Sequence, residues 1–431
     1  MAQFGRSACI AGLVVCLALA SCSSSTEPTS SSSATTIATT SAPKSSALNV
    51  IDPKAFQGTV ERLAKLLAVP GALVVLRTPQ GNFTASVGTT ALGAQTPPEA
   101  GTHFRIASNT KTMTAAVIVL LAQDGKLKLT DPVAAYVPDV PNGENITIAE
   151  LLKMRSGLYG YTSDPELSTM MDATPSKAWT PQEVLAIAFR HPPQFAPDAE
   201  YDYSNTNYAL LGLVAENVCG QPLARQFQDR LFGPVGLKQT SLPAIGDTAL
   251  PSPYSHGYMH GGSLYALADT PYPADMQAAA KAGTLKPIDY TNQNSSYATA
   301  AGGAISTADD LATWMKALVS GKVFGADYQQ QWLTSLQAED PAAPDGQKYG
   351  YGISYQRFGP NAAMYYHGGE MPGFNSFMGY DPDNDVALVI WTNLTLSPDG
   401  ETTAQGMLAP VLDVVYAGLN LVPPPTPTTT K

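Results

Sequence analysis

The segment Ala115 to Leu121 can only lie in the interior of a folded domain, because as a helix it has no polar face. The apolar run stops at Asp124-Gly125, where glycine is typical of a helix end. A helix of this kind has to be covered by other elements on every side. The chain has 431 residues, 44% of them hydrophobic, which is enough for one large domain or two smaller ones.

Two polar residues, Ser108 and Lys111, come directly before this apolar helix. Three positions apart, they share a helix face and can touch. A serine hydroxyl is a weak nucleophile until a base removes its proton. Burial and the positive end of the helix both lower the pKa of a lysine, and the helix start offers unpaired N–H groups to an oxyanion. We therefore interpret Ser108 as a nucleophile and Lys111 as its base.

The Ser-x-x-Lys spacing also has a simpler interpretation, in which Ser108 only caps the helix and Lys111 is a solvated side chain. The same spacing occurs at Ser41 and Lys44, in a Ser/Thr-rich stretch without any helical pattern. The spacing by itself is therefore weak. The buried helix that follows Ser108 is what favours the catalytic interpretation.

A second polar element is Tyr203-Ser204-Asn205, which precedes a helix expected from Tyr208 to Val218. A phenol beside a lysine ammonium can have its pKa lowered and can relay a proton to and from the serine. The amide of Asn205 can hold the lysine while it donates to a substrate carbonyl. For an isolated tyrosine, a core aromatic is the simpler interpretation, and Tyr-Thr-Asn at 290–292 repeats the pattern in a loop-like stretch.

A third element, His367-Gly368-Gly369, follows a strand expected at 363–366. Glycines allow a substrate backbone to approach a strand edge closely. The backbone N–H of Glu370 is a candidate for completing an oxyanion hole. An isolated His-Gly-Gly carries little weight, since 260–262 repeats it in a glycine-rich loop.

The two ends of the chain predict one sheet. A helix begins at Asp52-Pro53, an N-cap followed by proline, and ends near Pro70. A hairpin follows, while three strands and a helix at about 403–419 end the chain. We expect an α/β (α+β) fold, with an antiparallel sheet closed by both termini, flanking helices, a mostly helical insertion at roughly 126–300 and loops over a cleft at 243–296. The strands are expected at 72–76, 83–87, 363–366, 374–380 and 386–391.

The first residues predict export and a lipid anchor. Arg6 precedes an apolar stretch too short to span a bilayer, and Leu19-Ala20-Ser21-Cys22 resembles a bacterial lipobox. We expect residues 1–21 to be a signal peptide, Cys22 to carry lipid, and 22–49 to be a Ser/Thr-rich tether before a domain at 50–421 and a Pro/Thr tail at 422–431. This places the domain at the outer face of a bacterial membrane. An ordinary signal peptide is the alternative.

Composition excludes several other classes of function. A net charge of −11 without a basic stripe argues against nucleic-acid binding. Five histidines show no metal-ligand spacing, and no Gly-x-Ser-x-Gly elbow occurs, so we expect neither a metal nor another cofactor, and no α/β-hydrolase. Without the residues up to Cys22, only Cys219 remains, which excludes an internal disulfide; we expect it to be a buried small side chain at a helix end.

Taken together, the three polar elements in this order resemble the penicillin-recognising, β-lactamase-like serine hydrolases. Within that superfamily the chain is most similar to class C β-lactamases, D-alanyl-D-alanine carboxypeptidases and related esterases. The resemblance covers about residues 50 to 421 and is weakest at 243–296. Supporting stretches lie at 129–133, 146–158, 301–307, 349–352 and 372–374.

The resemblance implies that Ser108 is acylated and that Lys111 and Tyr203 share the proton transfers. It further implies that Asn205 contacts the substrate amide, that the N–H groups of Ser108 and Glu370 bind the oxyanion, and that the third element docks the substrate. His367 and Gly368 stand where many β-lactamases have Lys and Thr, which removes fixed contacts to a substrate carboxylate.

Three functions therefore stay open. The first is an acyl-transfer hydrolase acting on peptidoglycan stem peptides or β-lactams, and the second is a carboxylesterase with the same catalytic set. The third is a lipoprotein that binds cell-wall peptides without turnover. His367 separates the first two, because a protonated imidazole can dock a carboxylate, whereas a neutral, packed one cannot.

Overall fold

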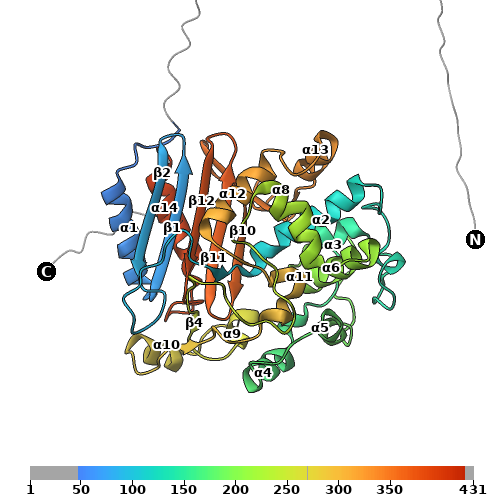
Figure 1. Ribbon diagram of the computed structural model, residues 1–431, viewed down its shortest axis with the longest axis horizontal. Coiled ribbons are helices and arrows are strands. Elements are labelled where there is room, and N and C mark those ends of the chain that lie inside the picture. Colours follow the sequence, from blue (N-terminus) through green and yellow to red (C-terminus); the bar gives the residue numbers. More distant parts are fainter. Residues whose placement is uncertain (1–46, 269, 423–431) are drawn as a thin grey trace, which may run out of the picture. The chain divides into compact units, whose positions relative to one another are not determined.

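The computed structural model describes residues 47–268 and 270–422 and confirms the expected α/β (α+β) class (Figure 1). Its frame is an eight-stranded sheet. The strands are β1 (Gly71–Thr78), β2 (Gly81–Gly88), β7 (Gln337–Ala338), β8 (Lys348–Tyr349), β9 (Ser354–Gly359), β10 (Ala362–Met371), β11 (Phe374–Asp381) and β12 (Val386–Thr392). Their spatial order is β2-β1-β12-β11-β10-β9-β8-β7, and every neighbouring pair is antiparallel.

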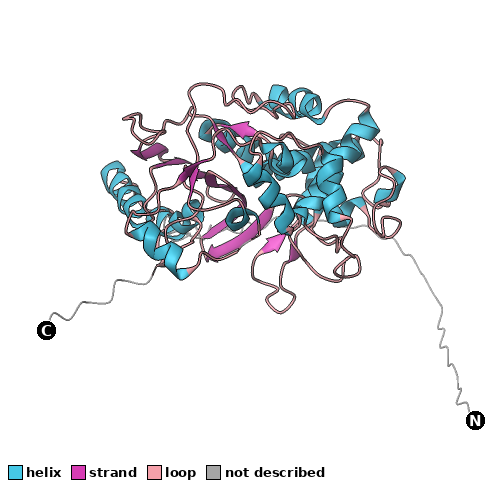
Figure 2. Ribbon diagram, turned by 90° about the horizontal axis from the view of Figure 1, so that it is seen from below, coloured by secondary structure: helices cyan, strands magenta, loops and turns pink. Residues whose placement is uncertain are grey.

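The sheet is closed from both ends of the chain, as expected, because β1 pairs with β12 and Leu73 lies opposite Trp391. Side chains alternate between the two faces of these strands. Leu73 and Val75 join the larger core, whereas Val74 and Leu76 pack with the terminal helices α1 (Pro53–Leu66) and α14 (Thr403–Val415). Figure 2 shows the strands between helices on both sides.

The terminal helices begin where the sequence predicts. The carboxylate of Asp52 caps α1 by accepting a hydrogen bond of 2.7 Å from the backbone N–H of Ala55. The last helix begins at Thr403 as expected, but it ends at Val415, earlier than predicted.

The apolar helix expected after Ser108 is α2 (Thr110–Gln123), in which every residue from Thr110 to Ala122 is buried. It is surrounded by α6 (Asn205–Cys219), α11 (Thr299–Gly302) and α13 (Ala326–Thr334), together with α7 (Leu223–Phe227). The second helix predicted from the sequence, α6, ends at Gly220 in the left-handed conformation, with φ of 64°. Cys219 before it is a free thiol and is half-buried, less than expected.

Helices are the main regular elements between residues 126 and 300, although loops and turns make up more than half of that region. The expectation of loops throughout 243–296 is wrong, because this stretch also forms two helices and a two-stranded sheet. Its elements are β4 (Tyr258–Met259), α9 (Leu264–Leu267), α10 (Ala274–Lys281) and β5 (Ile288–Asp289). The other helices and short strands are β3 (Phe104–Arg105), α3 (Ile148–Leu152), α4 (Pro165–Ala173), α5 (Pro181–Ala188), α8 (Gly233–Val235), β6 (Ile305–Ser306) and α12 (Ala308–Val319).

The folded domain begins before residue 50, the boundary expected from the sequence. Leu48 forms an isolated bridge with Tyr416, and the backbone N–H of Ala417 donates to the carbonyl of Ala47 at 3.0 Å. The predicted signal peptide, Cys22 and most of the predicted tether lie outside the described residues. Within the described part of the chain, no helix has the length and apolar character that crossing a bilayer requires.

Candidate active site

Ser108 lies in a tight 3-10 turn (Ala107–Asn109) between β3 and α2. Ala107 has φ of 48°, a left-handed conformation that is rare for a residue with a side chain. The amide of Asn109 fastens the turn to the sheet, since it donates to the carbonyl of Ile106 at 2.9 Å and to Oγ of Ser376 on β11 at 2.8 Å. The turn that carries Ser108 is thus held from two sides.

Lys111 is fully buried, and its Nζ atom contacts three oxygens: Oγ of Ser108 at 2.9 Å, Oδ1 of Asn205 at 2.6 Å and the carbonyl of Ala301 at 2.8 Å. Burial lowers the pKa of Lys111 well below its ordinary value. A neutral amine has two N–H donors and one lone pair. When Lys111 is deprotonated, Asn205 and Ala301, which offer only acceptors here, can take both donors, and the lone pair is then left for the hydroxyl of Ser108.

Asn205 is the first residue of α6, and the side chain of Thr162 fixes its orientation. Its Nδ2 donates to Oγ1 of Thr162 at 3.0 Å, which directs the amide oxygen towards Lys111. The structure therefore has Asn205 holding the lysine, as the sequence analysis expects.

Tyr203, just before α6, brings its hydroxyl to Ser108, and Nζ of Lys111 lies 4.8 Å from the centre of its ring. One side of Tyr203 faces solvent, with 39% of the residue exposed, whereas its hydroxyl is enclosed. Burial raises the pKa of Tyr203 above its ordinary value and outweighs the hydrogen bond with Ser108. The expected lowering of this pKa is wrong, since it requires a charged ammonium and burial disfavours that charge on Lys111.

His367 lies inside β10 rather than after a strand, so the predicted strand end at residue 366 is too early. The side chain is buried. Its Nδ1 lies 2.6 Å from the carbonyl of Gly368 and must donate to it, so Nε2 accepts from the hydroxyl of Tyr349 at 3.1 Å. Burial is the main cause that lowers the pKa of His367 to about 3, and a charge on Lys111, whenever that lysine is protonated, lowers it further. The imidazole is therefore neutral near pH 7, which matches the packed, neutral alternative.

The third element presents an open strand edge to the site. Strand β9 pairs with β10 only as far as Tyr366, whereas β11 pairs with it through Met371. A Cβ on Gly369 would lie 2.3 Å from the carbonyl oxygen of Ile106, whereas Gly368 faces the other way, towards Gln405 of α14. The lack of a side chain at Gly369 thus leaves room for the turn that carries Ser108. The sequence analysis instead explained this glycine by the close approach of a substrate backbone.

Glu370 lines the small cavity in front of Ser108, and its carboxylate accepts a hydrogen bond of 3.3 Å from Asn375. Its backbone lies opposite Asn375 in the β10–β11 pairing. Within the described chain, no arginine, lysine or histidine lines this cavity. Its lining residues are Ala107, Ser108, Tyr161, Thr162, Asn205, Leu267, Tyr297, Ala298, Gly302, Glu370 and Met371.

Sequence reasoning did not assign three residues that complete the site, namely Thr162, Ala301 and Tyr349. Ala301 and Tyr349 lie in stretches that support the family resemblance, and this was the signal that could have found them. No such stretch contains Thr162. No residue of the repeated patterns at 260–262 and 290–292 lines the cavity in front of Ser108. The hydroxyl of Tyr290 donates to the carbonyl of Gly261 at 2.8 Å, and Ser41 lies outside the described residues.

Comparisons with solved structures agree with this architecture. The D-stereospecific amidohydrolase from Streptomyces sp. is 29% identical, with a TM-score of 0.71 over 83% of this chain and 97% of that chain. The D-amino acid amidase from Ochrobactrum anthropi SV3, complexed with L-phenylalanine amide, is 28% identical, with a TM-score of 0.69 over 84% and 97%.

Sequence comparisons identify the family. The putative penicillin-binding protein PbpX from Bacillus subtilis (strain 168) is 24% identical over 68% of this chain, which spans 62% of that protein. "Protein flp" from Staphylococcus aureus (strain MW2) is 26% identical over 68% of this chain, which spans 53% of that protein. The profile of the Beta-lactamase family matches residues 56–410. Since that match covers most of the chain that folds around Ser108 and Lys111, the protein belongs to the beta-lactamase family of serine hydrolases.

Proposed function

We propose that the protein is a serine amidohydrolase that forms an acyl-enzyme at Ser108 and cleaves amides of D-amino acids whose leaving side is uncharged. The contact between Nζ of the buried Lys111 and Oγ of the half-buried Ser108, 2.9 Å long, carries the proposal of an acyl-enzyme. It places a base with a lowered pKa against the hydroxyl that has to lose its proton.

The pKa of Lys111 is lowered and the pKa of Tyr203 is raised, and this difference separates the roles of the two residues. Lys111 is deprotonated more easily than an ordinary lysine, so it accepts the proton of Ser108 as Oγ attacks the substrate carbonyl carbon. Burial raises the pKa of Tyr203 above its ordinary value, so its phenol carries a proton near neutral pH and is in the form that can donate one. Its hydroxyl protonates the leaving nitrogen as the C–N bond breaks, and Lys111 returns the proton to the phenol.

The remaining steps use the same groups. In this proposal the N–H groups of Ser108 and Glu370 stabilise the oxyanion of each tetrahedral intermediate. Lys111 then takes a proton from water, whose oxygen attacks the acyl carbon, and Ser108 leaves with that proton restored. The substrate strand lies along the open edge of β10 beyond Tyr366.

The choice of an uncharged leaving side rests on His367 and on the cavity lining. His367 is neutral and uses both ring nitrogens within the protein, and the described residues that line the cavity include Glu370 but no cationic side chain. A substrate carboxylate would find no fixed positive charge here. The D-configuration of the substrate is inferred from the likeness to the D-stereospecific amidohydrolase and the D-amino acid amidase.

A D-alanyl-D-alanine carboxypeptidase or β-lactam-binding enzyme is the second candidate, supported by the likeness to the putative penicillin-binding protein. A matched pair of substrates separates the two. One is an acylated D-alanyl-D-alanine peptide, and the other is the same peptide with a C-terminal carboxamide. We expect kcat/KM to be at least as high for the carboxamide, and a preference of about tenfold for the free carboxylate would favour the carboxypeptidase.

A second set of hydrolysis assays tests whether the protein turns over any substrate. D-phenylalanine amide, its L-isomer and a p-nitrophenyl ester are added to the wild type and to Ser108→Ala. Hydrolysis of the D-amide that is lost in Ser108→Ala supports the proposal. Ester hydrolysis without any amide hydrolysis would point to a carboxylesterase, and binding without turnover would point to a cell-wall-binding protein.

A further inference from the structure

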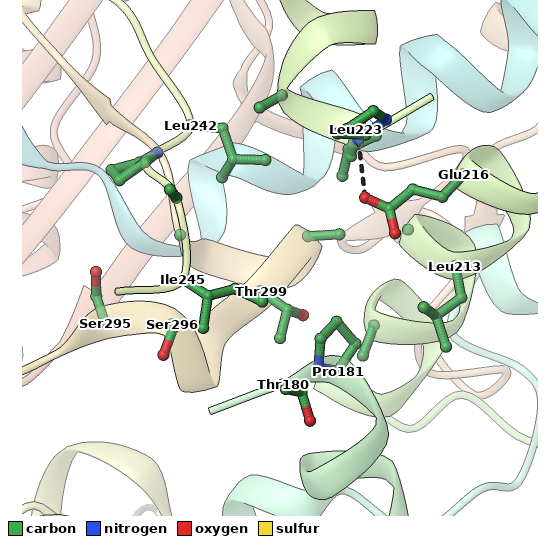
Figure 3. Close-up of a pocket in the computed structure, with 18 of the residues that line it drawn as sticks. Thr180, Pro181, Leu213, Glu216, Leu223, Leu242, Ile245, Ser295, Ser296 and Thr299 are labelled. Atoms are coloured by element: carbon green, nitrogen blue, oxygen red, sulfur yellow. Dashed lines mark hydrogen bonds between the residues drawn. The ribbon is translucent and has the colours of Figure 1, made fainter. Parts of the chain in front are cut away.

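A second cavity, of about 310 Å³, shares a wall with the cavity in front of Ser108, because residues of α11 and its flanks line both. Figure 3 shows side chains that line this second cavity, among them Glu216 and Leu223. Ala298 and Gly302, four positions apart, line the cavity in front of Ser108. Thr299, Ala300 and Gly303 line the second one, which we name the α11 cavity. One short helix thus contributes walls to both cavities.

The α11 cavity has mostly apolar walls contributed by α6, α7 and the segment 242–247. Leu213, Leu223 and Ile245 supply its hydrocarbon surface, and Ile245 is 43% exposed at the rim. A volume of this size suits a small organic molecule. Gly212 brings α6 close to α11, since a Cβ there would lie 2.6 Å from Cβ of Ala300.

The charges that face the α11 cavity are negative. Glu216 and Asp247 are the charged residues among its described lining residues. One oxygen of Glu216 accepts a hydrogen bond of 2.9 Å from the backbone N–H of Leu223, as Figure 3 shows. In the described part of the chain, neither carboxylate forms an ion pair within 4 Å.

A buried cation, Arg105, interacts electrostatically with Asp247, so Glu216 is the carboxylate on which the charge of the cavity depends. Arg105 does not line the cavity; its guanidinium donates to Oγ of Ser295 and to the carbonyls of Thr248 and Thr291. Apolar walls with carboxylates at their edge fit an apolar molecule that carries one positive charge.

Contacts on α11 connect this cavity with the catalytic lysine. The carbonyl of Ala301 accepts from Nζ of Lys111 at 2.8 Å, and the carbonyl of Ala300 accepts from the hydroxyl of Thr114 on α2 at 2.7 Å. Thr299, at the start of the helix, has φ of 45°, a strained conformation for a β-branched residue. A molecule that contacts Thr299 or Ala300 can therefore shift α11, and with it the carbonyl that holds Nζ of Lys111.

We propose that the α11 cavity binds a small apolar amine, with its ammonium at Glu216 and its hydrocarbon part between Leu213 and Leu223, and that occupancy changes the reactivity of Ser108 through α11. This inference goes beyond the proposed function, because the ligand is not the substrate and does not enter the cavity in front of Ser108.

Binding is tested by calorimetric titration of the intact protein with benzylamine, and with benzyl alcohol as its uncharged match. We expect saturable binding of benzylamine to the wild type, to Ser108→Ala and to Glu61→Gln, a control that removes an exposed carboxylate on α1. Glu216→Gln, which keeps an oxygen for the N–H of Leu223, should bind about tenfold more weakly, as should benzyl alcohol to the wild type. Unchanged affinity in Glu216→Gln, or loss of binding in Ser108→Ala, would overturn the site.

Coupling is tested by the rate at which a fluorophosphonate labels Ser108, because this reaction involves no acyl acceptor that an amine can replace. At saturating benzylamine we expect the rate for the wild type to change by about fivefold, and the rate for Glu216→Gln to stay constant. A constant rate in the wild type would overturn the coupling. If no labelling occurs at all, the proposed hydrolase fails, while the calorimetric result still decides the site.

Discussion

Gly369 on β10 lies against the carbonyl oxygen of Ile106 so closely that a Cβ atom on Gly369 would be 2.3 Å from that oxygen. The same Cβ would lie 2.5 Å from Oγ of Ser376 and 2.8 Å from Nδ2 of Asn109. These atoms belong to the turn that carries Ser108 and to its anchor on β11. The distance between the docking strand and the nucleophile is therefore set by the absence of a side chain at residue 369.

The first prediction is that Gly369→Ala displaces the turn and lowers kcat/KM by about 100-fold, because small displacements at a reacting atom are costly. Gly368→Ala is the matched control. Its Cβ would meet Nε2 of Gln405 at 2.8 Å, the movable end of a flexible side chain, so we expect nearly full activity. Equal activity of the two variants would mean that the approach of Gly369 to Ile106 is not critical.

Lys111→Arg should lower kcat/KM by about 1,000-fold, because a guanidinium keeps its positive charge and cannot accept the proton of Ser108. Steady-state kinetics measures this loss, and circular dichroism checks that the fold is retained. Because Lys111 acts in its neutral form, the wild-type rate should rise with pH as this lysine loses its proton. Substantial turnover by the arginine variant would make Lys111 a structural residue.

Tyr203→Phe should slow the hydrolysis of amides more than that of p-nitrophenyl esters. An amide nitrogen needs a proton in order to leave, whereas p-nitrophenolate leaves without one. We expect about a 100-fold fall for D-phenylalanine amide and a much smaller fall for the ester, measured as kcat. Equal losses for both substrates would remove Tyr203 from the role of proton donor.

His367 should make the fold sensitive to acid. Its pKa is lowered from an ordinary 6.5 to about 3, so between these values the unfolded chain binds more protons than the folded protein. The free energy of unfolding contributed by His367 is therefore complete above pH 6.5 and is lost as the pH falls towards 3. Urea unfolding across this range should show a shallower pH dependence for His367→Gln. Identical slopes would show that the imidazole titrates normally.

The lipid anchor remains a prediction from the sequence, which places Cys22 after Leu19-Ala20-Ser21. Cys22→Ala should release the protein from the membrane fraction of a bacterial host. Mass spectrometry of the mature wild-type protein should find an acylated N-terminal cysteine. Sedimentation of the variant with membranes, together with an unmodified Cys22, would contradict the anchor.

The frame of the fold was predictable where local pattern and burial agree. The all-apolar run in α2 required burial, and Asp52-Pro53 marked the start of α1 through capping chemistry that depends only on neighbouring residues. The contact of Ser108 with Lys111 was predictable for the same reason, since it depends on helical spacing within one segment.

The contacts that tune the site were not predictable, because they join distant segments. The extension of β10 through Gly368 and Gly369 contradicts strand propensity and is imposed by pairing with β11. The low pKa of His367 depends on burial beside Tyr349, and the orientation of Asn205 depends on Thr162. Ala301 acts through its backbone carbonyl, which every residue possesses.

The position of β12 between β1 and β11 also determines how much of the chain must be present before the sheet can form. Without Val386–Thr392, the hairpin of β1 and β2 has no neighbour on its inner edge, and β11 has an equally unpaired edge. An incomplete chain that stops before residue 386 therefore carries two separate parts of the sheet, each with an exposed strand edge that can pair with another chain. Such chains should need a chaperone, whereas the addition of one further strand removes both exposed edges at once.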